Sequence, residues 1–174
     1  MIFGLTGKIG SGKTALLDNI KGCVKLNFKE PLVREIENNF PDLLRELRKL
    51  YKAKTNKQLF EEKKPLVRAL LQNYGTDVRR TEDDDYWIKK IIDRLPSRNK
   101  CVIIGDVRFI NEAKMIREFG GKIIRITREN TDNGSHKSEL EMNKIIADHT
   151  IENNGTIEEM VELFNVIKKY EEGT

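Results

Sequence analysis

Eight residues near the amino end constrain this chain more than any other feature. The segment Gly7-Lys8-Ile9-Gly10-Ser11-Gly12-Lys13-Thr14 joins an apolar run to a helix-forming stretch. Glycines at this spacing let backbone N–H groups turn inward around phosphate oxygens, and the helix start adds the positive end of its dipole. The lysine can reach the β and γ phosphates, and the threonine hydroxyl can ligate Mg²⁺. The alternative interpretation is a glycine-rich turn with an incidental lysine, which would not require the flanking apolar run and helix-forming stretch. We therefore predict a loop that binds triphosphate through Gly7, Lys8, Gly10, Ser11, Gly12, Lys13 and Thr14.

Length and charge bound the remaining possibilities. At 174 residues and 38% hydrophobic content, the chain can bury one substantial core, so we expect a single domain over residues 1–174. Thirty-two Lys and Arg against 28 Asp and Glu give a net charge of +4, with the two signs mixed along the sequence. This excess is too mild to indicate a nucleic-acid partner, and it suits a protein that handles several phosphate groups.

Cysteine usage and hydropathy indicate a cytoplasmic protein. Cys23 and Cys101 lie far apart in sequence and each opens an apolar run, so we expect two buried thiols rather than a disulfide or a zinc site. The amino end lacks a signal-peptide pattern, and no apolar stretch approaches membrane-spanning length. No membrane partner is expected.

Five short apolar runs alternate with longer amphipathic stretches, which predicts a parallel sheet with helical crossovers. The expected strands are Ile2–Leu5, Cys23–Phe28, Cys101–Gly105, Lys122–Thr127 and His149–Glu152. The expected crossover helices are Lys13–Lys21, Ile110–Phe119, Ser138–Ala147 and Thr156–Tyr170.

Two segments depart from this alternation. Residues 31–95 form an insertion with helices expected at Pro31–Asn38, Pro41–Lys52, Lys57–Tyr74 and Asp83–Leu95, where substrate selectivity would be built. The stretch from Thr127 to His136 is polar and rich in turn formers, so we expect a lid over residues 128–138.

Asp106 is the expected metal-side carboxylate. It ends an apolar strand, and the carboxyl ends of parallel strands converge on the edge where a phosphate loop holds Mg²⁺. The alternative is an aspartate that merely ends a strand in a turn. Val107 and Arg108 follow instead of a second acidic residue, which favours phosphoryl transfer over hydrolysis coupled to work.

Arginines at element boundaries are candidates for binding the phosphate of an acceptor, because the guanidinium donates two parallel hydrogen bonds and stays charged. The candidates are Arg79 and Arg80 in the insertion, Arg108 beyond the third strand, and Arg125 and Arg128 near the lid. For any one of them, a solvated surface role is the alternative.

Aromatic and polar residues supply weaker candidates. Trp87 and Tyr74 could pack against a base or simply fill a core. Thr81 with the acids at 82–85 is more typical of a helix cap than of a metal cluster. His136, Ser138 and Glu139 close the lid, with a substrate role, a helix cap at Ser138 or plain exposure all open.

Together these motifs resemble the deoxynucleoside monophosphate kinases of bacteriophage type, within the nucleotide kinases that carry a phosphate-binding loop. The matching segments are Gly4–Lys8 with Gly10–Thr14, Phe28–Leu32, Leu70–Arg80 with Trp87, Gly105–Phe109, Ser135–Glu139 and Asp148–Gly155. Animal phosphomevalonate kinases and dephospho-coenzyme A kinases share parts of this pattern, so the resemblance fixes the reaction type better than the acceptor.

The resemblance implies a three-layer α/β fold with a five-stranded parallel sheet, a helical acceptor-binding insertion and a lid. It implies that Lys13, Asp106, Arg108 and Arg128 are catalytic and that Thr14 and Asp106 hold Mg²⁺. It also implies that Arg80 and Arg108 bind the acceptor phosphate. The acceptor site that we expect comprises Phe28, Tyr74, Arg79, Arg80, Trp87, Arg108, His136, Ser138 and Glu139. Where the family usually has a small residue and Asp before Pro-Leu and a Lys after it, this chain has Lys29, Glu30 and Val33, which leaves the pocket near Phe28 open.

The expected reaction is transfer of the γ-phosphoryl group of ATP to a deoxynucleoside or ribonucleoside monophosphate, by a monomer or homodimer, in the host cytoplasm if a phage encodes it. One alternative is a kinase of another small phosphorylated metabolite. Another is a nucleotide-controlled switch, but the nearest segment to a guanine-reading Asn-Lys-x-Asp motif, Asn143–Ile146, lacks the acid.

Overall fold

The computed structural model describes residues 1–174 except 63, 98–99, 130–136 and 174. The chain forms two compact units. Unit 1 comprises Met1–Asn27 and Ile91–Thr174, and unit 2 comprises Phe28–Lys90. The predicted insertion, residues 31–95, covers nearly the same residues as unit 2. The single-domain organisation stays a prediction.

Unit 1 is built on a five-stranded, all-parallel sheet, which confirms the predicted fold class. The strands are β1 (Ile2–Thr6), β2 (Val24–Leu26), β3 (Val102–Ile104), β4 (Lys122–Thr127) and β5 (His149–Glu152). Their order is β2-β3-β1-β4-β5. The central strand is therefore β1, and the segment that follows it lies at the middle of the sheet's carboxyl edge.

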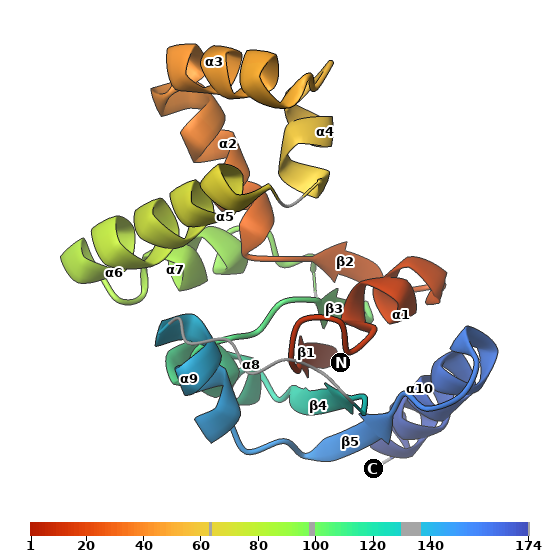
Figure 1. Cartoon of the computed structure of the whole chain (residues 1–174). Coiled ribbons are helices and arrows are strands. Elements are labelled where there is room, and N and C mark those ends of the chain that lie inside the picture. The colour runs from red at the N-terminus through yellow and green to blue at the C-terminus, as the bar shows by residue number, and fades with distance from the viewer. Residues whose placement is uncertain (63, 98–99, 130–136, 174) are drawn as a thin grey trace. The chain divides into compact units, whose positions relative to one another are not determined.

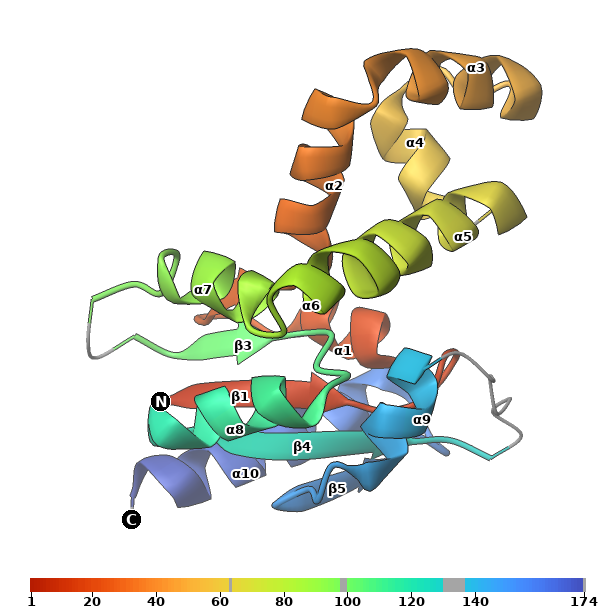
Figure 2. The same cartoon turned by 90° about the vertical axis from the view of Figure 1, so that its left-hand side faces the viewer.

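Helices cover both faces of this sheet (Figures 1 and 2). On one face lie α1 (Lys13–Asn19) and α10 (Ile157–Glu172), and on the other lie α8 (Ile110–Glu118) and α9 (Lys137–Lys144). Successive residues of β1 point to opposite faces, as a strand requires. Phe3 packs edge-to-face on Phe164 of α10, with ring centroids 5.4 Å apart. A Cβ on Gly4 would lie 2.6 Å from Cδ1 of Ile116 in α8, so this glycine lets α8 approach the sheet.

Cys23 and Cys101 form a disulfide, so the expectation of two buried thiols was wrong. The reason is strand register: Val24 of β2 pairs with Val102 of β3, which places the preceding residues side by side with Cα atoms 4.6 Å apart. The bond closes a loop that contains all of unit 2.

Unit 2 is helical. Its elements are α2 (Lys29–Asn39), α3 (Pro41–Tyr51), α4 (Asn56–Glu61), α5 (Pro65–Gln72), a π-helix η1 (Asn73–Val78), α6 (Arg79–Glu82) and α7 (Tyr86–Ile92), whose end belongs to unit 1. Its own core is formed by Ile36, Leu44, Leu47, Ala53, Leu59, Phe60, Val67 and Tyr74.

Two helix predictions in unit 2 were wrong. The predicted helix over 57–74 is divided, because Pro65 starts a new helix where its missing N–H costs nothing, and a π-helix begins at Asn73. Thr81 does not cap a helix: it lies inside α6, and its hydroxyl donates to the Asp77 carbonyl at 2.8 Å.

Within the described part of the chain, every helix is too short or too polar to traverse a lipid bilayer.

Candidate functional site

The loop from Gly7 to Thr14, called the phosphate loop below, adopts a backbone that only glycine tolerates well. Gly7, Gly10 and Gly12 have φ angles of 142°, 84° and 101°. A Cβ on Gly7 would lie 2.2 Å from the Ile126 carbonyl oxygen in the neighbouring strand β4. Conformation therefore favours glycine at all three positions, and at Gly7 the lack of space also excludes a side chain.

The side chains of the phosphate loop lie where a phosphate tail could meet them. The Lys13 ammonium folds back over the loop and donates to the carbonyls of Gly7 and Lys8, the latter at 2.7 Å, and to Ser11 Oγ at 3.3 Å. Thr14, in the first turn of α1, is exposed. Among the described residues no side chain caps the start of α1 at Gly12, which leaves its N–H groups oriented for an anion.

Asp106 lies beside the phosphate loop. The next residue, Val107, donates its N–H to the Leu5 carbonyl at 3.0 Å, which ties this turn to the end of β1. The preceding residue, Gly105, is covered by Leu17 of α1, and a Cβ there would lie 2.6 Å from the leucine Cδ2. The half-buried carboxylate and Lys13 thus share one edge of the sheet, as their placement after β3 and β1 predicts.

Arg108 follows on the same edge and is held by a buried acid. The Glu112 side chain accepts from the N–H groups of Arg108 and Phe109 at 2.7 and 3.1 Å and is only 2% exposed. The Arg108 guanidinium is half-buried, and in the described part of the chain no acceptor binds it. A partly desolvated cation of this kind is suited to binding an anionic substrate.

Around the predicted lid, only part of the site lies within the described residues. Arg128 is exposed just beyond β4. Arg125 is instead a structural residue, because it donates to the carbonyls of Met142, at 3.3 Å, and Ile145 near the end of α9, and burial lowers its pKa. His136 lies outside the described residues, as do the side chains of Ser138 and Glu139 in α9.

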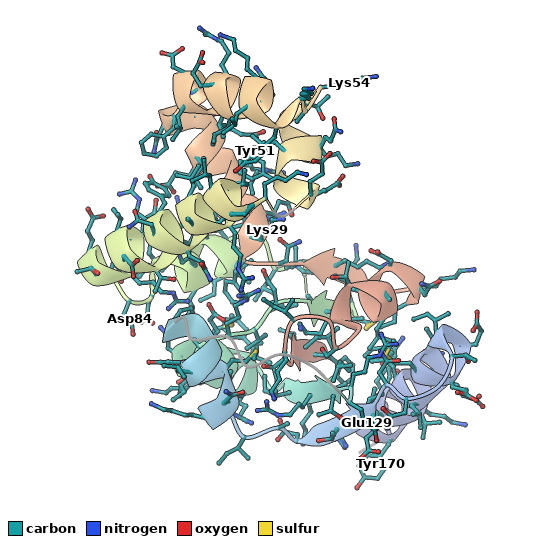
Figure 3. All side chains as sticks on the ribbon, in the orientation of Figure 1. Lys29, Tyr51, Lys54, Asp84, Glu129 and Tyr170 are labelled. Atoms are coloured by element: carbon teal, nitrogen blue, oxygen red, sulfur yellow. A yellow bond between two sulfur atoms is a disulfide. The ribbon has the colours of Figure 1, made fainter. Side chains whose placement is uncertain are left out.

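In unit 2, Arg80 and Trp87 are both buried. The Arg80 side chain is 3% exposed, and its guanidinium donates to the Asp84 carbonyl at 2.8 Å. Asp84 lies in the connection between α6 and α7 (Figure 3). Trp87 donates its Nε1–H to the Gly75 carbonyl of the π-helix at 2.8 Å. This bond satisfies a backbone group of η1, and it accounts for the polar atom of a tryptophan that is only 3% exposed.

Arg79 belongs to what we call the Glu35 cluster: Glu35, Tyr74, Arg79 and Tyr86. The Glu35 carboxylate accepts from the Tyr74 hydroxyl at 2.8 Å, the Tyr86 hydroxyl at 2.6 Å and the Arg79 guanidinium. The guanidinium also lies over both tyrosine rings, 5.2 Å from each centroid. Arg79 is thus bound within unit 2, whereas the sequence predicts it as an acceptor ligand.

The cluster shifts the acidities of its members. Burial acts to raise the pKa of Glu35, but hydrogen bonds from Tyr86, Tyr74 and Arg79 outweigh it and hold the pKa below its usual value. Burial, reinforced by the hydrogen bond to Glu35, raises the pKa of Tyr86 to about 12. Both tyrosines therefore stay protonated donors at neutral pH.

The segment that departs from the expected pattern begins unit 2. Phe28 is 7% exposed and precedes α2. Lys29 donates its ammonium to the Phe60 carbonyl at the end of α4, at 3.0 Å, and so joins two helices of the unit (Figure 3).

The oxygen donors at the phosphate loop fit a metal that arrives with its nucleotide. Thr14 offers an exposed hydroxyl and Asp106 a half-buried carboxylate. In the described ranges no group of three or more metal-ligating side chains gathers. Mg²⁺ commonly takes one or two protein oxygens and completes its shell with phosphates and water, so these donors suit it.

Three features of the site had no individual prediction. Glu35 is one acid among many in a charged helix, and nothing in its surroundings marks it. Glu112 occupies the third position of α8, where a carboxylate commonly accepts backbone N–H groups, so helix-start rules could have found it. Asn153 belongs to the matched segment Asp148–Gly155, but its contact with the phosphate loop spans 142 residues.

Comparison with known proteins gives a consistent result. The family model described as deoxynucleotide monophosphate kinase matches residues 15–163, a range that begins just after the phosphate loop. A protein of Acanthamoeba polyphaga mimivirus with the provisional name deoxynucleotide monophosphate kinase is 32% identical over 182 residues, covering 91% of each chain.

Solved structures resemble the chain more distantly. A dephospho-CoA kinase from Campylobacter jejuni is 17% identical, with 99% of this chain and 98% of that chain covered and a TM-score of 0.49. TT1252 from Thermus thermophilus is 19% identical over 97% of both chains, with a TM-score of 0.48. The fold assignment rests on the strand order and the phosphate loop rather than on these scores.

Proposed function

Because this chain belongs to the deoxynucleotide monophosphate kinase family, it is an ATP-dependent phosphotransferase, and we propose that it transfers the γ-phosphoryl group of ATP, bound with Mg²⁺, to a deoxynucleoside monophosphate. The products are ADP and the deoxynucleoside diphosphate. The observation that best supports this chemistry is the meeting of a complete phosphate loop and Asp106 at one edge of a parallel sheet.

The triphosphate end of the reaction uses the phosphate loop. Backbone N–H groups at the start of α1 bind phosphate oxygens, and the helix dipole favours their negative charge. Lys13 leaves the loop carbonyls that it contacts and neutralises charge that spreads over the γ-phosphoryl oxygens. Thr14 and Asp106 would hold Mg²⁺, which would supply positive charge against the phosphate oxygens.

The acceptor end uses arginines. We assign Arg108 to the phosphate of the acceptor, because its guanidinium is half-buried and its backbone is fixed by Glu112. Arg80 is the second candidate for this role, and Arg128 the candidate for the transferring group. A monophosphate is already an anionic nucleophile, so the reaction requires orientation and charge neutralisation rather than a general base.

The substrate is testable with a panel. ADP release is measured, through a coupled assay, with each deoxynucleoside and ribonucleoside monophosphate and with dephospho-coenzyme A and phosphomevalonate. We expect turnover with at least one deoxynucleoside monophosphate and none with the other two metabolites. Silence with every nucleotide would overturn the proposal.

Arg108→Ala tests the acceptor assignment in the same assay. We expect KM for the acceptor to rise by about tenfold or more while KM for ATP changes little, because one charge-assisted pair to phosphate is lost. Arg45→Ala, an exposed arginine of α3, is the matched control. Unchanged acceptor kinetics in Arg108→Ala would remove this role.

A further inference from the structure

Asn153 lies directly after β5, in a connection that hydrogen bonds anchor at both of its ends. Its N–H donates to the Thr127 carbonyl at the end of β4, at 2.8 Å. Three residues later, Thr156 begins α10 with a reciprocal cap: its hydroxyl accepts from the Glu159 N–H at 3.2 Å, and the Glu159 carboxylate accepts from the Thr156 N–H at 2.8 Å. The asparagine therefore projects from a short, well-anchored connection.

The side chain of Asn153 contacts the phosphate loop. Its Nδ2 donates to the Ser11 carbonyl oxygen at 2.8 Å in a partly buried position. It also lies directly over the next residue, because a Cβ on Gly12 would be 2.2 Å from this nitrogen. Gly12 is therefore required by its φ of 101° and by the close approach of Asn153.

This hydrogen bond orients a peptide group. In a trans peptide, the C=O of one residue and the N–H of the next point in opposite directions within one plane. When Asn153 holds the Ser11 oxygen, the Gly12 N–H must point away from Asn153. Gly12 is the residue that precedes α1, where N–H groups bind anions.

The glycine-rich loop cannot hold this orientation by its own conformational preference. Rotating the Ser11–Gly12 peptide by half a turn would take the Gly12 φ from 101° to about −80°, which glycine adopts as readily. The rotated peptide would direct a carbonyl oxygen, with its partial negative charge, where the N–H had been. Such a loop would repel phosphate at one of its binding positions.

We propose that Asn153 is a positioning residue, which locks the Ser11–Gly12 peptide so that the Gly12 N–H donates to the triphosphate. The inference rests on the proposed function of the phosphate loop. An asparagine suits the role because its amide donates to a carbonyl without adding charge near phosphates. An aspartate of the same shape would oppose the Ser11 oxygen with a second acceptor and a negative charge.

The test compares two ligands that share a phosphate tail. Calorimetry measures binding of the imido analogue of ATP, which resists transfer, and of inorganic tripolyphosphate, both with Mg²⁺. We expect Asn153→Ala to weaken both by about tenfold, the effect of one lost hydrogen bond that orders the loop, and Asn153→Asp to weaken both further. In turnover, KM for ATP should rise while KM for the acceptor stays unchanged. Asn154→Ala, the exposed next residue, should leave both affinities unchanged.

Other outcomes are distinguishable. Loss of affinity for the ATP analogue alone would mean that Asn153 contacts the base, and it would overturn the inference, as would unchanged affinity for both ligands. If the wild type binds both ligands but phosphorylates no monophosphate, the proposed acceptor fails while the role of Asn153 stands on the titrations. If the wild type binds neither, both proposals fail.

A titration of the wild-type protein tests the inference without depending on whether the variants fold. The amide signal of Gly12 in a ¹⁵N spectrum should shift when tripolyphosphate is added. A Gly12 signal that stays fixed at saturation would overturn the inference.

Discussion

The phosphate loop of unit 1 and the Glu35 cluster of unit 2 present cations in opposite ways. The loop consists of contiguous residues, uses backbone groups, and holds Lys13 on carbonyl oxygens that a phosphate can replace. The cluster gathers side chains from α2, η1, α6 and α7, and it binds Arg79 to a carboxylate that also accepts from two tyrosines. A phosphate can replace the carbonyl groups that hold a cation, whereas a cation paired with a partly buried carboxylate mainly stabilises its own unit.

The largest expected effect concerns the loop. Lys13→Ala should lower the rate of ADP formation by about 1000-fold, because it removes the charge closest to the transferring phosphoryl group. Thermal unfolding of Lys13→Ala checks that the variant is folded, so that a loss of turnover reports on the missing ammonium. Lys114→Ala, an exposed position on α8, is the control. Retained turnover in Lys13→Ala would contradict the role of Lys13 in neutralising the transferring phosphoryl group.

The next largest effect concerns the disulfide between Cys23 and Cys101, which closes the loop that contains unit 2. Closing a loop of this length by a disulfide stabilises a fold by about 4 kcal/mol in the chain-entropy description. Reduction should therefore lower the denaturant midpoint of the oxidised protein, and Cys23→Ser should abolish the response to reductant. An oxidised protein whose midpoint ignores reductant would show that the bond contributes no stability.

Glu35→Gln tests the cluster itself. We expect a loss of about 2 kcal/mol in the free energy of unfolding, because the half-buried Arg79 guanidinium loses one of its two carboxylate partners, Glu35 and Glu82, and the tyrosine hydroxyls lose a charged acceptor. Glu46→Gln in α3 is the control, since the Glu46 and Lys49 side chains of its ion pair are both 67% exposed, and the substitution should change the free energy of unfolding far less. Equal effects in the two variants would remove the distinction that we draw for unit 2.

The smallest expected effect is a pH dependence in unit 1. The hydrogen bond from His149 to Glu171, helped by Lys122 and opposed by burial, holds the pKa of Glu171 below its usual value. A depressed carboxyl pKa stabilises the fold above the unfolded value, near 4.5, and this stability is lost as the pH falls through the folded pKa. Urea unfolding between pH 6 and pH 3 should therefore show a steeper loss in the wild type than in Glu171→Gln. Identical slopes would contradict the assignment.

The same contrast explains what the sequence could predict. Strand existence, strand type and the phosphate loop follow from local patterns: apolar runs, glycine spacing and the lysine that precedes α1. Asp106 could be placed because strand ends of a parallel sheet share one edge. These features depend on residues close together in sequence or on a general rule of topology.

The missed features depend on tertiary neighbours. Cys23 and Cys101 pair because two strands align in register, which their separate apolar contexts do not reveal. Glu35 and Arg79 are 44 residues apart in the chain, so the local sequence around either residue does not indicate that the two form a pair. The division of the predicted helix over 57–74 was partly foreseeable, because Pro65 marks a helix start, while the π-helix at Asn73–Val78 has no local signal that we recognise.

We infer that the phosphate loop delivers a phosphoryl group from ATP to a deoxynucleoside monophosphate. The most direct test of this transfer is the stoichiometry of products, measured by chromatography after incubation of the protein with ATP, Mg²⁺ and the preferred monophosphate. We expect one deoxynucleoside diphosphate for each ADP formed, and neither product in Lys13→Ala. ADP without any diphosphate would instead identify a hydrolase.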